Sequence, residues 1–365
     1  MPNLTPPITT VDAALSYKAR LQVIDPSITY LMTLYLHPSL TPEVIAEAAK
    51  AGIAGVKAYP AGVTTNSSAG VVDWESFYPV FGALEKEGLV LNLHGEVPPK
   101  SRKITEQQSE KEANDDVNVL TAEELFLPTL KQIHSAFPNL KIVLEHCTTS
   151  AALNLVAACG GNVAATITAH HLWLTIDDVV SDVDNFCKPV AKSESDRQAL
   201  LRAAVGQYDD RLEGRIMFGS DSAPHDIGKK HVDAGAKSAA GCFTQPYTTQ
   251  LVVGAVEEGL EDGILDAAKF GGQDGLVGKL AAFLSENGRR FYGVDQGSRA
   301  GDGGGSEGAR IVLERKMPVR IMGSISGRST SEVVNCFRGG AKAWSLRWID
   351  SQGKDIEKWN KIPSS

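Results

Sequence analysis

The chain is poor in cysteine and lacks any paired cysteine motif. Its 365 residues include 5 Cys, an odd number, and no Cys-x-x-Cys occurs. A disulfide framework uses an even set of cysteines, and cysteine-based zinc sites usually place them in such pairs. We therefore predict neither feature, and we expect a reducing compartment.

Long apolar runs and basic stretches are also absent from the sequence. No apolar run approaches the roughly 18 residues of a membrane span, and residues 1–15 have neither the basic nor the apolar region of a secretory signal. The formal net charge is −8, and no basic stripe of the kind that binds nucleic acid is present. We expect a cytoplasmic protein with no nucleic-acid partner and no membrane association.

Short apolar segments alternate with amphipathic segments along the first two thirds of the chain. The expected strands are Tyr30–Tyr35, Gly55–Tyr59, Leu89–His94, Lys141–His146, Val163–Thr168 and Arg215–Ser220. The expected helices between them include Pro42–Ala51, Trp74–Glu87, Ala122–Ala136 and Ser193–Val205. This alternation is typical of parallel βαβ units, and the number of strands favours an α/β fold of the (β/α)8 TIM-barrel type.

Four of the expected strands end in a residue that can do chemistry. These residues are Lys57, His94, His146 and Asp221. The carboxyl ends of barrel strands meet at one mouth, so residues far apart in sequence can lie together there. Two imidazoles and a carboxylate suit a catalytic zinc ion. The pattern predicts a metal site, although a single histidine at a strand end is more often a hydrogen-bonded core residue.

Lys57 can be interpreted in two ways. A buried lysine tends to lose its charge, and a neutral amine reacts with carbon dioxide to give a carbamate, an anionic ligand that can bridge two metals. Alternatively, its side chain extends from the strand end to solvent. The pattern alone favours the second interpretation.

Three polar segments near these strand ends have less certain roles. Asp221 and His225 could act as a base and a substrate-binding group, or could lie in an ordinary turn. The small polar residues of Thr64–Gly70 could close over a ligand as a lid, or form a solvated loop. His170 and His171 follow another strand, where neighbours face opposite ways; at most one can face the mouth, and we expect both to be structural.

Six sequence segments together resemble one enzyme family. They are MPNLTPPITTVDAALSYKARL, GVKAYPAGVTTNSS, LNLHGEV, VLEHCTT, FGSDSAPH and AAGCF. In order and spacing they are similar to the monofunctional dihydroorotases of bacteria and fungi, in the amidohydrolase superfamily. The similarity extends from Met1 to about Gly293, and AKAWSLRWI near the C-terminus resembles the closing strand of the family.

The resemblance implies a two-zinc hydrolase of the pyrimidine pathway. Lys57 would be the carboxylated lysine that bridges the metals, His94 and His146 would bind the second zinc, and Asp221 would bind the first and act as general base and acid. At the position of Lys188, bacterial members have an apolar residue, which a backbone contact tolerates. The substrate would be held by Asn3, Thr64, Thr65, His94, Lys188, His225 and Ala240.

One family motif is missing from this sequence. Dihydroorotases begin with a strand that ends in His-x-His, which binds the first zinc, and an arginine soon after; no His-x-His occurs here. The resemblance therefore predicts a barrel without its first strand and most of its second, and a chain that is poorly active or unstable as written. Either upstream coding sequence is omitted, which we favour, or the chain is a truncated homologue.

We expect a single hydrolase domain with one flexible insertion. We expect a hydrolase barrel over residues 1–293, a flexible Gly/Ser-rich insertion over 294–310, and a segment over 311–365 that closes the same domain. The expected reaction is hydrolysis of dihydroorotate, a small-molecule substrate, by a chain that could form a homodimer. The alternatives are a hydantoinase- or allantoinase-type hydrolase and an inactive scaffold subunit.

Overall fold

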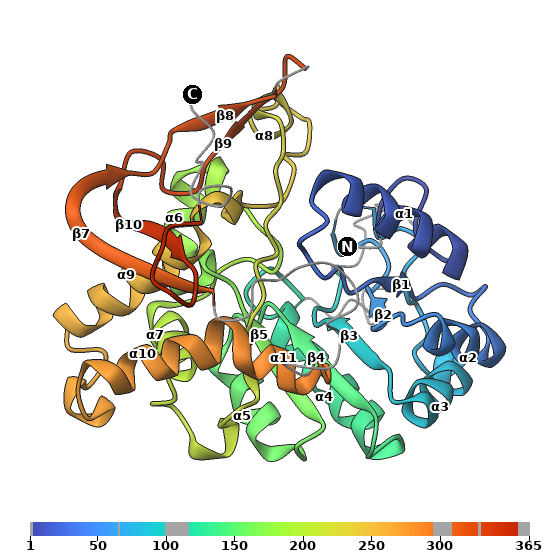
Figure 1. The fold of residues 1–365 in the computed structure, drawn as a ribbon. Helices are drawn as coiled ribbons and strands as arrows, with labels where there is room; N and C mark the ends of the chain where they lie inside the picture. Colours follow the sequence, from blue (N-terminus) through green and yellow to red (C-terminus); the bar gives the residue numbers. More distant parts are fainter. Residues whose placement is uncertain (1–2, 65, 99–116, 295–308, 328–329, 357–365) are drawn as a thin grey trace.

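A six-stranded parallel sheet lies at the centre of the molecule (Figure 1). The computed structural model describes residues 3–64, 66–98, 117–294, 309–327 and 330–356. The strands pair in chain order: β1 (Thr33–Tyr35), β2 (Gly55–Ala58), β3 (Val90–His94), β4 (Lys141–Glu145), β5 (Val163–Ile167) and β6 (Ile216–Phe218). All six expected strands are present, and all neighbouring pairs are parallel as predicted.

The strands are short and apolar because they are buried on both faces. Every residue of β2 and β3 is buried, as expected for parallel strands that face helices on one side and a packed interior on the other. Within the described residues the sheet runs from β1 to β6. The predicted loss of a first barrel strand stays a prediction.

Helices lie between successive strands and cover the outer face of the sheet (Figure 1). Their bounds are α1 (Val11–Ile24), α2 (Pro42–Lys50), α3 (Tyr78–Glu87), α4 (Ala122–Ala136), α5 (Ser150–Ala158), α6 (Ile176–Ser181), α7 (Glu194–Ala204), α8 (Ile227–Lys230), α9 (Thr248–Glu261), α10 (Gln273–Ala281) and α11 (Asn287–Phe291). The four helices predicted from sequence are found with ends that differ by a few residues. The segment before α3 is a 3₁₀ turn, Glu75–Phe77.

Side-chain caps explain where several of these helices begin. Thr149 accepts a hydrogen bond from the Ala152 N–H at 3.1 Å at the start of α5, and Ser193 accepts one from the Asp196 N–H at 3.2 Å at the start of α7. Hydroxyl caps of this kind satisfy amide groups that have no partner within the helix. The caps therefore start α5 a few residues after the end of β4, and α7 after the segment that follows α6.

At the amino end of the sheet, one arginine connects the start of β6 to the end of α5 and to the turn before β5. Arg215 precedes β6, and its guanidinium donates to the carbonyls of Val156, Cys159, Gly160 and Val163 at 2.9 to 3.2 Å and to that of Ala157 at 3.3 Å. These carbonyls belong to the end of α5 and the turn that leads into β5. One side chain thus adds donors at a helix end, where the last carbonyls have few partners within the helix.

The C-terminal region adds two antiparallel pairs outside the parallel sheet. β7 (Arg310–Arg320) pairs with β10 (Lys342–Ile349), and β8 (Ser324–Ser326) pairs with β9 (Val333–Asn335). The segment AKAWSLRWI, which resembles the closing strand of the family, forms β10. From Ala343 to Ile349 every residue is half-buried, because β10 has a single neighbouring strand and both of its faces reach partly into solvent.

The same region is continuous with the main core. Ile321, Cys336 and Phe337 belong to the cluster of buried apolar side chains that fills the interior of the molecule. This packing supports a C-terminal segment that closes the same domain, although the boundaries at 293 and 311 stay predictions. The predicted Gly/Ser-rich insertion lies almost entirely outside the described residues.

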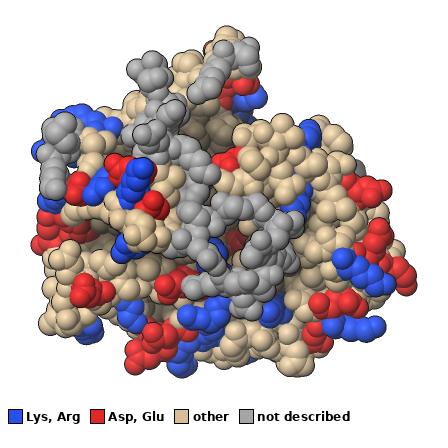
Figure 2. Space-filling model, viewed as in Figure 1, with Lys and Arg blue, Asp and Glu red and all other residues tan. Residues whose placement is uncertain are grey.

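Charged side chains of both signs are interspersed on the face of the molecule in Figure 2. Among the side chains coloured on this face, blue and red groups alternate along the lower edge and no continuous basic stripe appears. In the described part of the chain, every helix is too short or too polar to span a bilayer.

Candidate metal and active site

The structure brings the four predicted strand-end residues into one group. Lys57 lies near the end of β2, His94 ends β3, His146 follows β4, and Asp221 lies three residues beyond β6. The rings of His94 and His146 are in edge contact, with centroids 4.6 Å apart. Lys57 is close enough to His94, His146 and Asp221 to shift the pKa of each. The predicted convergence at the mouth is confirmed as geometry.

Lys57 is buried and paired. Its side chain is 3% exposed, and its Nζ donates to the Glu145 carboxylate at the end of β4. The ammonium also lies 4.9 Å from the centre of the Tyr59 ring. The alternative in which Lys57 extends to solvent is therefore wrong, because the strand end opens into the protein interior and a carboxylate is already there to receive the side chain.

His94 is held by a buried carboxylate. Its Nε2 lies 2.7 Å from Glu96 Oε2, and both side chains are 1% exposed. Burial lowers the pKa of His94, and Glu96 opposes this shift. Burial alone would raise the pKa of Glu96, but the hydrogen bond to His94 and the charges of Lys192 and Lys188 lower it overall. A carboxylate behind an imidazole is the usual arrangement around metal-ligating histidines.

His146 occupies a strained position with an unpaired ring nitrogen. Its φ is +45°, a left-handed conformation that is uncommon for a residue with a side chain. The Thr166 hydroxyl accepts its backbone N–H at 2.7 Å, while its Nδ1 is buried without a hydrogen-bond partner among the described residues. Burial, and then the charges of His94 and Lys57, hold its pKa well below the usual value. A neutral imidazole with a free nitrogen is the form that binds a metal.

Asp221 has an environment suited to proton transfer. Its φ is +38°, so it also lies in the left-handed region. Burial raises its pKa to about 7, the charge of Lys57 opposes the shift, and the Glu145 carboxylate adds to it. A carboxyl group with a pKa near neutrality can accept and release a proton at physiological pH.

Two predicted substrate contacts lie near one loop after β2. The Asn66 side-chain amide donates to the Asn3 carbonyl at 3.0 Å, and the Ser67 hydroxyl accepts from the Thr64 N–H at 2.9 Å. Ser67 is 1% exposed, so the loop is anchored inward by its hydroxyl. Thr65 lies outside the described residues, and the proposed lid stays a prediction.

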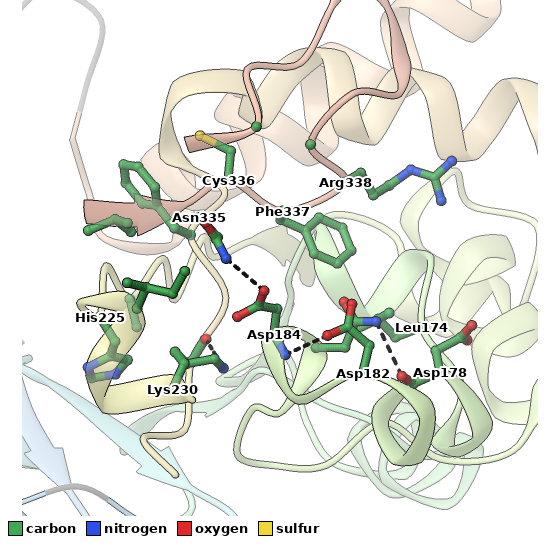
Figure 3. A pocket seen from close by; sticks show the side chains of 18 of the residues that line it. Leu174, Asp178, Asp182, Asp184, His225, Lys230, Asn335, Cys336, Phe337 and Arg338 are labelled. Carbon is green, nitrogen blue, oxygen red and sulfur yellow. Dashed lines mark hydrogen bonds between the residues drawn. The ribbon is translucent and has the colours of Figure 1, made fainter. Parts of the chain in front are cut away.

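Three further predicted contacts lie after β5 and β6. His225 and Ala240 are brought together, since His225 Nε2 donates to the Ala240 carbonyl at 3.0 Å. Lys188 is partly buried and acts electrostatically on Glu96. His225 also lines a cavity of about 520 Å³ between the start of α8 and the β8–β9 hairpin, with Asp184 and Lys230 on its wall (Figure 3). Among the described residues that line this cavity, none is a predicted metal ligand.

Sequence reasoning missed a set of buried charges beneath the mouth. Glu145 pairs with Lys57, and Lys192 acts on both Glu96 and Glu123. Glu123 accepts the Thr148 N–H at 2.9 and 3.1 Å with its two oxygens. Two of these carboxylates lie in a motif, Glu96 in His-Gly-Glu and Glu145 in Leu-Glu-His, and that adjacency was the signal available in the sequence; Glu123 has no such neighbour.

The expectation that the side chains of His170 and His171 face opposite ways is wrong, because the strand before them ends earlier than predicted. β5 ends at Ile167, and His170–Leu172 form a 3₁₀ turn. A 3₁₀ turn has three residues per turn, so neighbouring side chains do not alternate between opposite faces. Both rings are instead buried on the same side, with centroids 4.4 Å apart.

The donor groups at the mouth fit a divalent metal. His146 presents a buried nitrogen without a partner, both imidazoles are neutral at physiological pH because burial lowers their pKa, and Asp221 supplies carboxylate oxygens. Histidine nitrogen and carboxylate oxygen are common zinc ligands. The ends of the other two strands, β1 and β5, add no ligand to this set.

Comparisons with known proteins agree with this site. A family model described as amidohydrolase matches residues 28–294, so the chain belongs to the amidohydrolases, hydrolases of the metal-dependent type with a TIM-type barrel. L-Hydantoinase from Arthrobacter aurescens has the same fold, with a TM-score of 0.70 at 15% identity, covering 98% of this chain and 77% of that one.

Within that class, the chain is a member of the dihydroorotase family. It is 42% identical to the dihydroorotase of Saccharomyces cerevisiae over 95% of this chain and 88% of that protein. It is 51% identical to the probable dihydroorotase of Schizosaccharomyces pombe over 74% of this chain and 72% of that protein. A crystal structure of the Saccharomyces cerevisiae enzyme with 5-fluoroorotic acid aligns with a TM-score of 0.80 and 40% identity, covering 96% and 89%. The family predicted from sequence is confirmed.

Proposed function

We propose that this chain catalyses the reversible hydrolysis of the cyclic amide of (S)-dihydroorotate to N-carbamoyl-L-aspartate, a step of de novo pyrimidine synthesis. The observation that carries the proposal is the meeting of Lys57, His94, His146 and Asp221 at one end of the sheet, in a chain of the dihydroorotase family. We further propose that it acts in the cytoplasm as a homodimer with two zinc ions, the first of which has only Asp221 and the carboxylated Lys57 as ligands in this chain because no His-x-His occurs.

Four side chains would hold the metal. They are Lys57 in its carboxylated form, His94, His146 and Asp221. When bound, zinc polarises a carbonyl group and lowers the pKa of a coordinated water toward neutrality. The pairing of Lys57 with Glu145 places a carboxylate where a carbamate on Lys57 would extend, so Glu145 must turn aside when the lysine is carboxylated.

Asp221 would move the proton. It takes a proton from the attacking water as the carbon–oxygen bond forms, and it gives that proton to the ring nitrogen as the carbon–nitrogen bond breaks. Its pKa of about 7 suits both halves of this transfer, because the acid and base forms are present together at neutral pH. In the reverse direction the same group deprotonates the amide nitrogen that closes the ring.

The remaining predicted residues would hold the substrate. Asn3 and the Thr64–Thr65 loop would cover it from the β2 side, and the backbone at Lys188 and Ala240 would contact it from the opposite side. His225 fixes the Ala240 carbonyl through its 3.0 Å hydrogen bond. A substrate enclosed in this way is shielded from bulk water, which strengthens polar contacts to the reacting carbonyl.

The test is dihydroorotate hydrolysis by the purified chain, with zinc per chain measured on the same sample. We expect Asp221→Asn to lower kcat by about 10³-fold, since positioned general bases contribute roughly 10²- to 10⁴-fold. Asp233→Asn is the matched control, because Asp233 is exposed and its side chain makes none of the hydrogen bonds or ion pairs found among the described residues.

Two outcomes would contradict the proposal. Turnover of a hydantoin but not of dihydroorotate would favour the hydantoinase alternative, and zinc binding without turnover of either compound would favour the scaffold alternative. Equal activity of Asp221→Asn and the parent chain would remove Asp221 from the proton transfer.

A further inference from the structure

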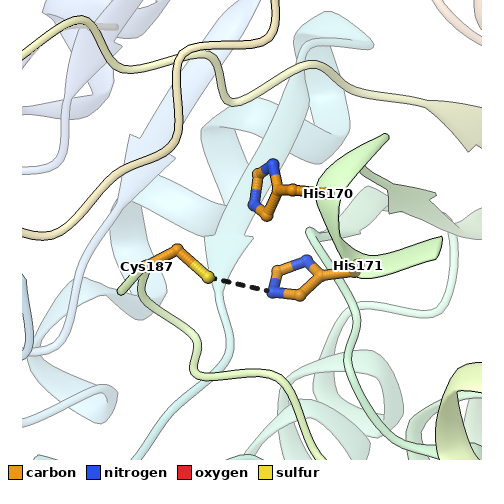
Figure 4. A group of neighbouring side chains, drawn as sticks. All are labelled: His170, His171 and Cys187. Carbon is orange, nitrogen blue, oxygen red and sulfur yellow. Dashed lines mark hydrogen bonds between the residues drawn. The ribbon is translucent and has the colours of Figure 1, made fainter. Parts of the chain in front are cut away.

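Three side chains of the types that bind metals lie together (Figure 4). The two histidines among them are close enough to His146 to lower its pKa, but none of the three is a proposed ligand of the mouth. They are His170 and His171, from the 3₁₀ turn after β5, and Cys187, from the loop that leads to Lys188. Their potential ligand atoms all lie within 4.8 Å of one another, and each of the three residues is 1% exposed. The sequence interval between His171 and Cys187 gave no hint of this meeting.

His170 is the member that most needs a partner. Both of its ring nitrogens are buried without a hydrogen-bond partner among the described residues. Leaving a buried polar group unpaired destabilises the folded protein. Burial, followed by the charges of His171 and Lys230, holds its pKa well below the usual value, so the ring is neutral. A neutral imidazole with unpaired ring nitrogens can bind a metal ion.

His171 is already oriented by contacts at both of its ring nitrogens. Its Nδ1 lies 2.9 Å from the Thr168 hydroxyl and its Nε2 lies 2.9 Å from the Pro189 carbonyl. Because a carbonyl only accepts, Nε2 carries the proton and donates it to Pro189, while Nδ1 accepts from the Thr168 hydroxyl. An ion at Nε2 would replace that proton and the contact with Pro189, and the ring proton would then lie on Nδ1, where the Thr168 oxygen can accept it. That arrangement is the one found behind metal-ligating histidines, whose second nitrogen donates to a fixed acceptor.

Cys187 stands at a suitable distance from that nitrogen. Its Sγ is 3.6 Å from His171 Nε2, and two ligands of a tetrahedral zinc site, one nitrogen and one sulfur, are about 3.5 Å apart. Cys242 is also buried and interacts with Cys187 through its side chain, so it is the candidate for a fourth ligand. The hydrogen bond with Cys242 and burial raise the pKa of the Cys187 thiol well above its usual value, and Lys230 opposes a cation here, so a bound ion would have to displace the thiol proton.

We propose that His170, His171 and Cys187 bind one zinc-class transition-metal ion, separate from the metals of the mouth. The mixed nitrogen and sulfur donors favour zinc or cobalt over magnesium or calcium. The ion would join the turn after β5 to the loop that carries Lys188. The absence of Cys-x-x-Cys predicted no cysteine-based zinc site; here a single cysteine joins two histidines from another loop, which spacing within one motif does not reveal.

The test uses cobalt as a spectroscopic probe on the full-length protein. A thiolate bound to Co²⁺ gives a near-ultraviolet charge-transfer absorption, and the proposed ligands of the mouth include no cysteine. We expect this absorption to reach one equivalent of cobalt per chain and to be lost in Cys187→Ser. Cys159→Ser should keep it, because Cys159 is half-buried at the end of α5 and belongs to no ligand group. We expect His170→Gln to weaken cobalt binding by at least about tenfold, since even the loss of a residue that only supports a ligand has such an effect.

Separate outcomes distinguish this site from the mouth. Asp221→Asn should leave the charge-transfer absorption unchanged, whatever it does to turnover. Absence of the absorption at any cobalt concentration, or its persistence in Cys187→Ser, would overturn the proposal. If Cys187→Ser does not fold, zinc X-ray absorption on the parent protein decides the question: a sulfur neighbour at about 2.3 Å supports the site, and only nitrogen and oxygen neighbours refute it.

Discussion

The two ends of the parallel sheet are built in opposite ways. At the carboxyl end, His146 and Asp221 both have positive φ, and His146 keeps a buried nitrogen without a partner among the described residues. At the amino end, the Arg215 guanidinium reaches five carbonyls of the α5 terminus and the following turn. One end tolerates backbone strain and incomplete hydrogen bonding, and the other end supplies additional donors to its carbonyls.

This difference separates residues kept for chemistry from residues kept for stability. Strained conformations and unpaired polar groups persist only where surrounding structure holds them, and they gather at functional sites. In barrel enzymes the carboxyl ends of the strands carry the chemistry and the opposite ends contribute stability. Substitutions at the two ends should therefore affect different measurements, and each prediction below tests that separation.

The largest effect on stability is expected at the amino end. Arg215→Ala removes the guanidinium donors to the five carbonyls, of which those of Val156 and Gly160 keep a backbone N–H donor. We expect it to lower the free energy of unfolding by about 4 kcal/mol, because each hydrogen bond to a charged group contributes roughly 1.5 to 3 kcal/mol and part of the loss is recovered by water and by the remaining donors. Urea denaturation measures this change. Activity per folded molecule should stay close to that of the parent chain.

Arg211→Ala is the matched control for this substitution. The Arg211 side chain is 65% exposed and pairs with Asp209 in the same turn, and surface ion pairs contribute at most about 1 kcal/mol. Equal stability of the two variants would show that the carbonyls at the end of α5 do not depend on Arg215.

The strands and their active ends were predictable from sequence for physical reasons. A parallel strand buried on both faces must be a continuous apolar run, so its position can be read without knowing its neighbours. Parallel order then places Lys57, His94, His146 and Asp221 at one end however far apart they lie in the chain. These predictions needed only local pattern and one rule of topology.

The remaining contacts depend on tertiary distances that a local pattern does not contain. The pairing of Lys57 with Glu145 joins residues 88 positions apart, and the sharing of Lys192 between Glu96 and Glu123 involves a loop, a helix and a strand end. The prediction for His170 and His171 was wrong in its geometry because the alternation of a strand was applied to residues three and four positions beyond its last residue, Ile167. The 3₁₀ turn that follows the strand places the two side chains differently.

A smaller and pH-dependent effect is expected at Glu123, behind the mouth. Burial raises its pKa to about 7, although Lys192 and the hydrogen bonds from Thr148 and Thr149 oppose the shift. The folded state therefore holds a proton that the unfolded state releases near pH 4.5, and stability falls as the pH rises from about 4.5 to 7. For a shift of this size the loss is about 3 kcal/mol.

Glu123→Gln should remove that dependence. Its free energy of unfolding relative to the parent chain should increase by about 3 kcal/mol between pH 4.5 and pH 8, measured by urea denaturation at each pH. Glu124→Gln, at the exposed neighbouring position on α4, should show a constant difference. A constant difference for both variants would mean that Glu123 is ionised across the whole range.

The smallest effect is expected at Glu96, which contacts the proposed ligand His94 but is not itself a proposed metal ligand. Its carboxylate lies 2.7 Å from His94 Nε2. When Nε2 carries the ring proton and donates it to Glu96, Nδ1 is the nitrogen left to bind a metal. In Glu96→Gln the amide can accept the same proton but lacks the negative charge. We expect zinc affinity to fall about 10- to 100-fold, the range found when such supporting partners are removed, while kcat at saturating zinc changes much less.

That split between metal affinity and kcat distinguishes a positioning role from a purely structural one. Glu47→Gln, at an exposed position on α2, is the control and should change neither quantity. Lost stability with unchanged zinc affinity would place Glu96 among residues kept for the fold, like Arg215 at the other end. Lower zinc affinity with unchanged stability would place Glu96 among the functional residues at the carboxyl end of the sheet, because its carboxylate would then fix the tautomer of His94.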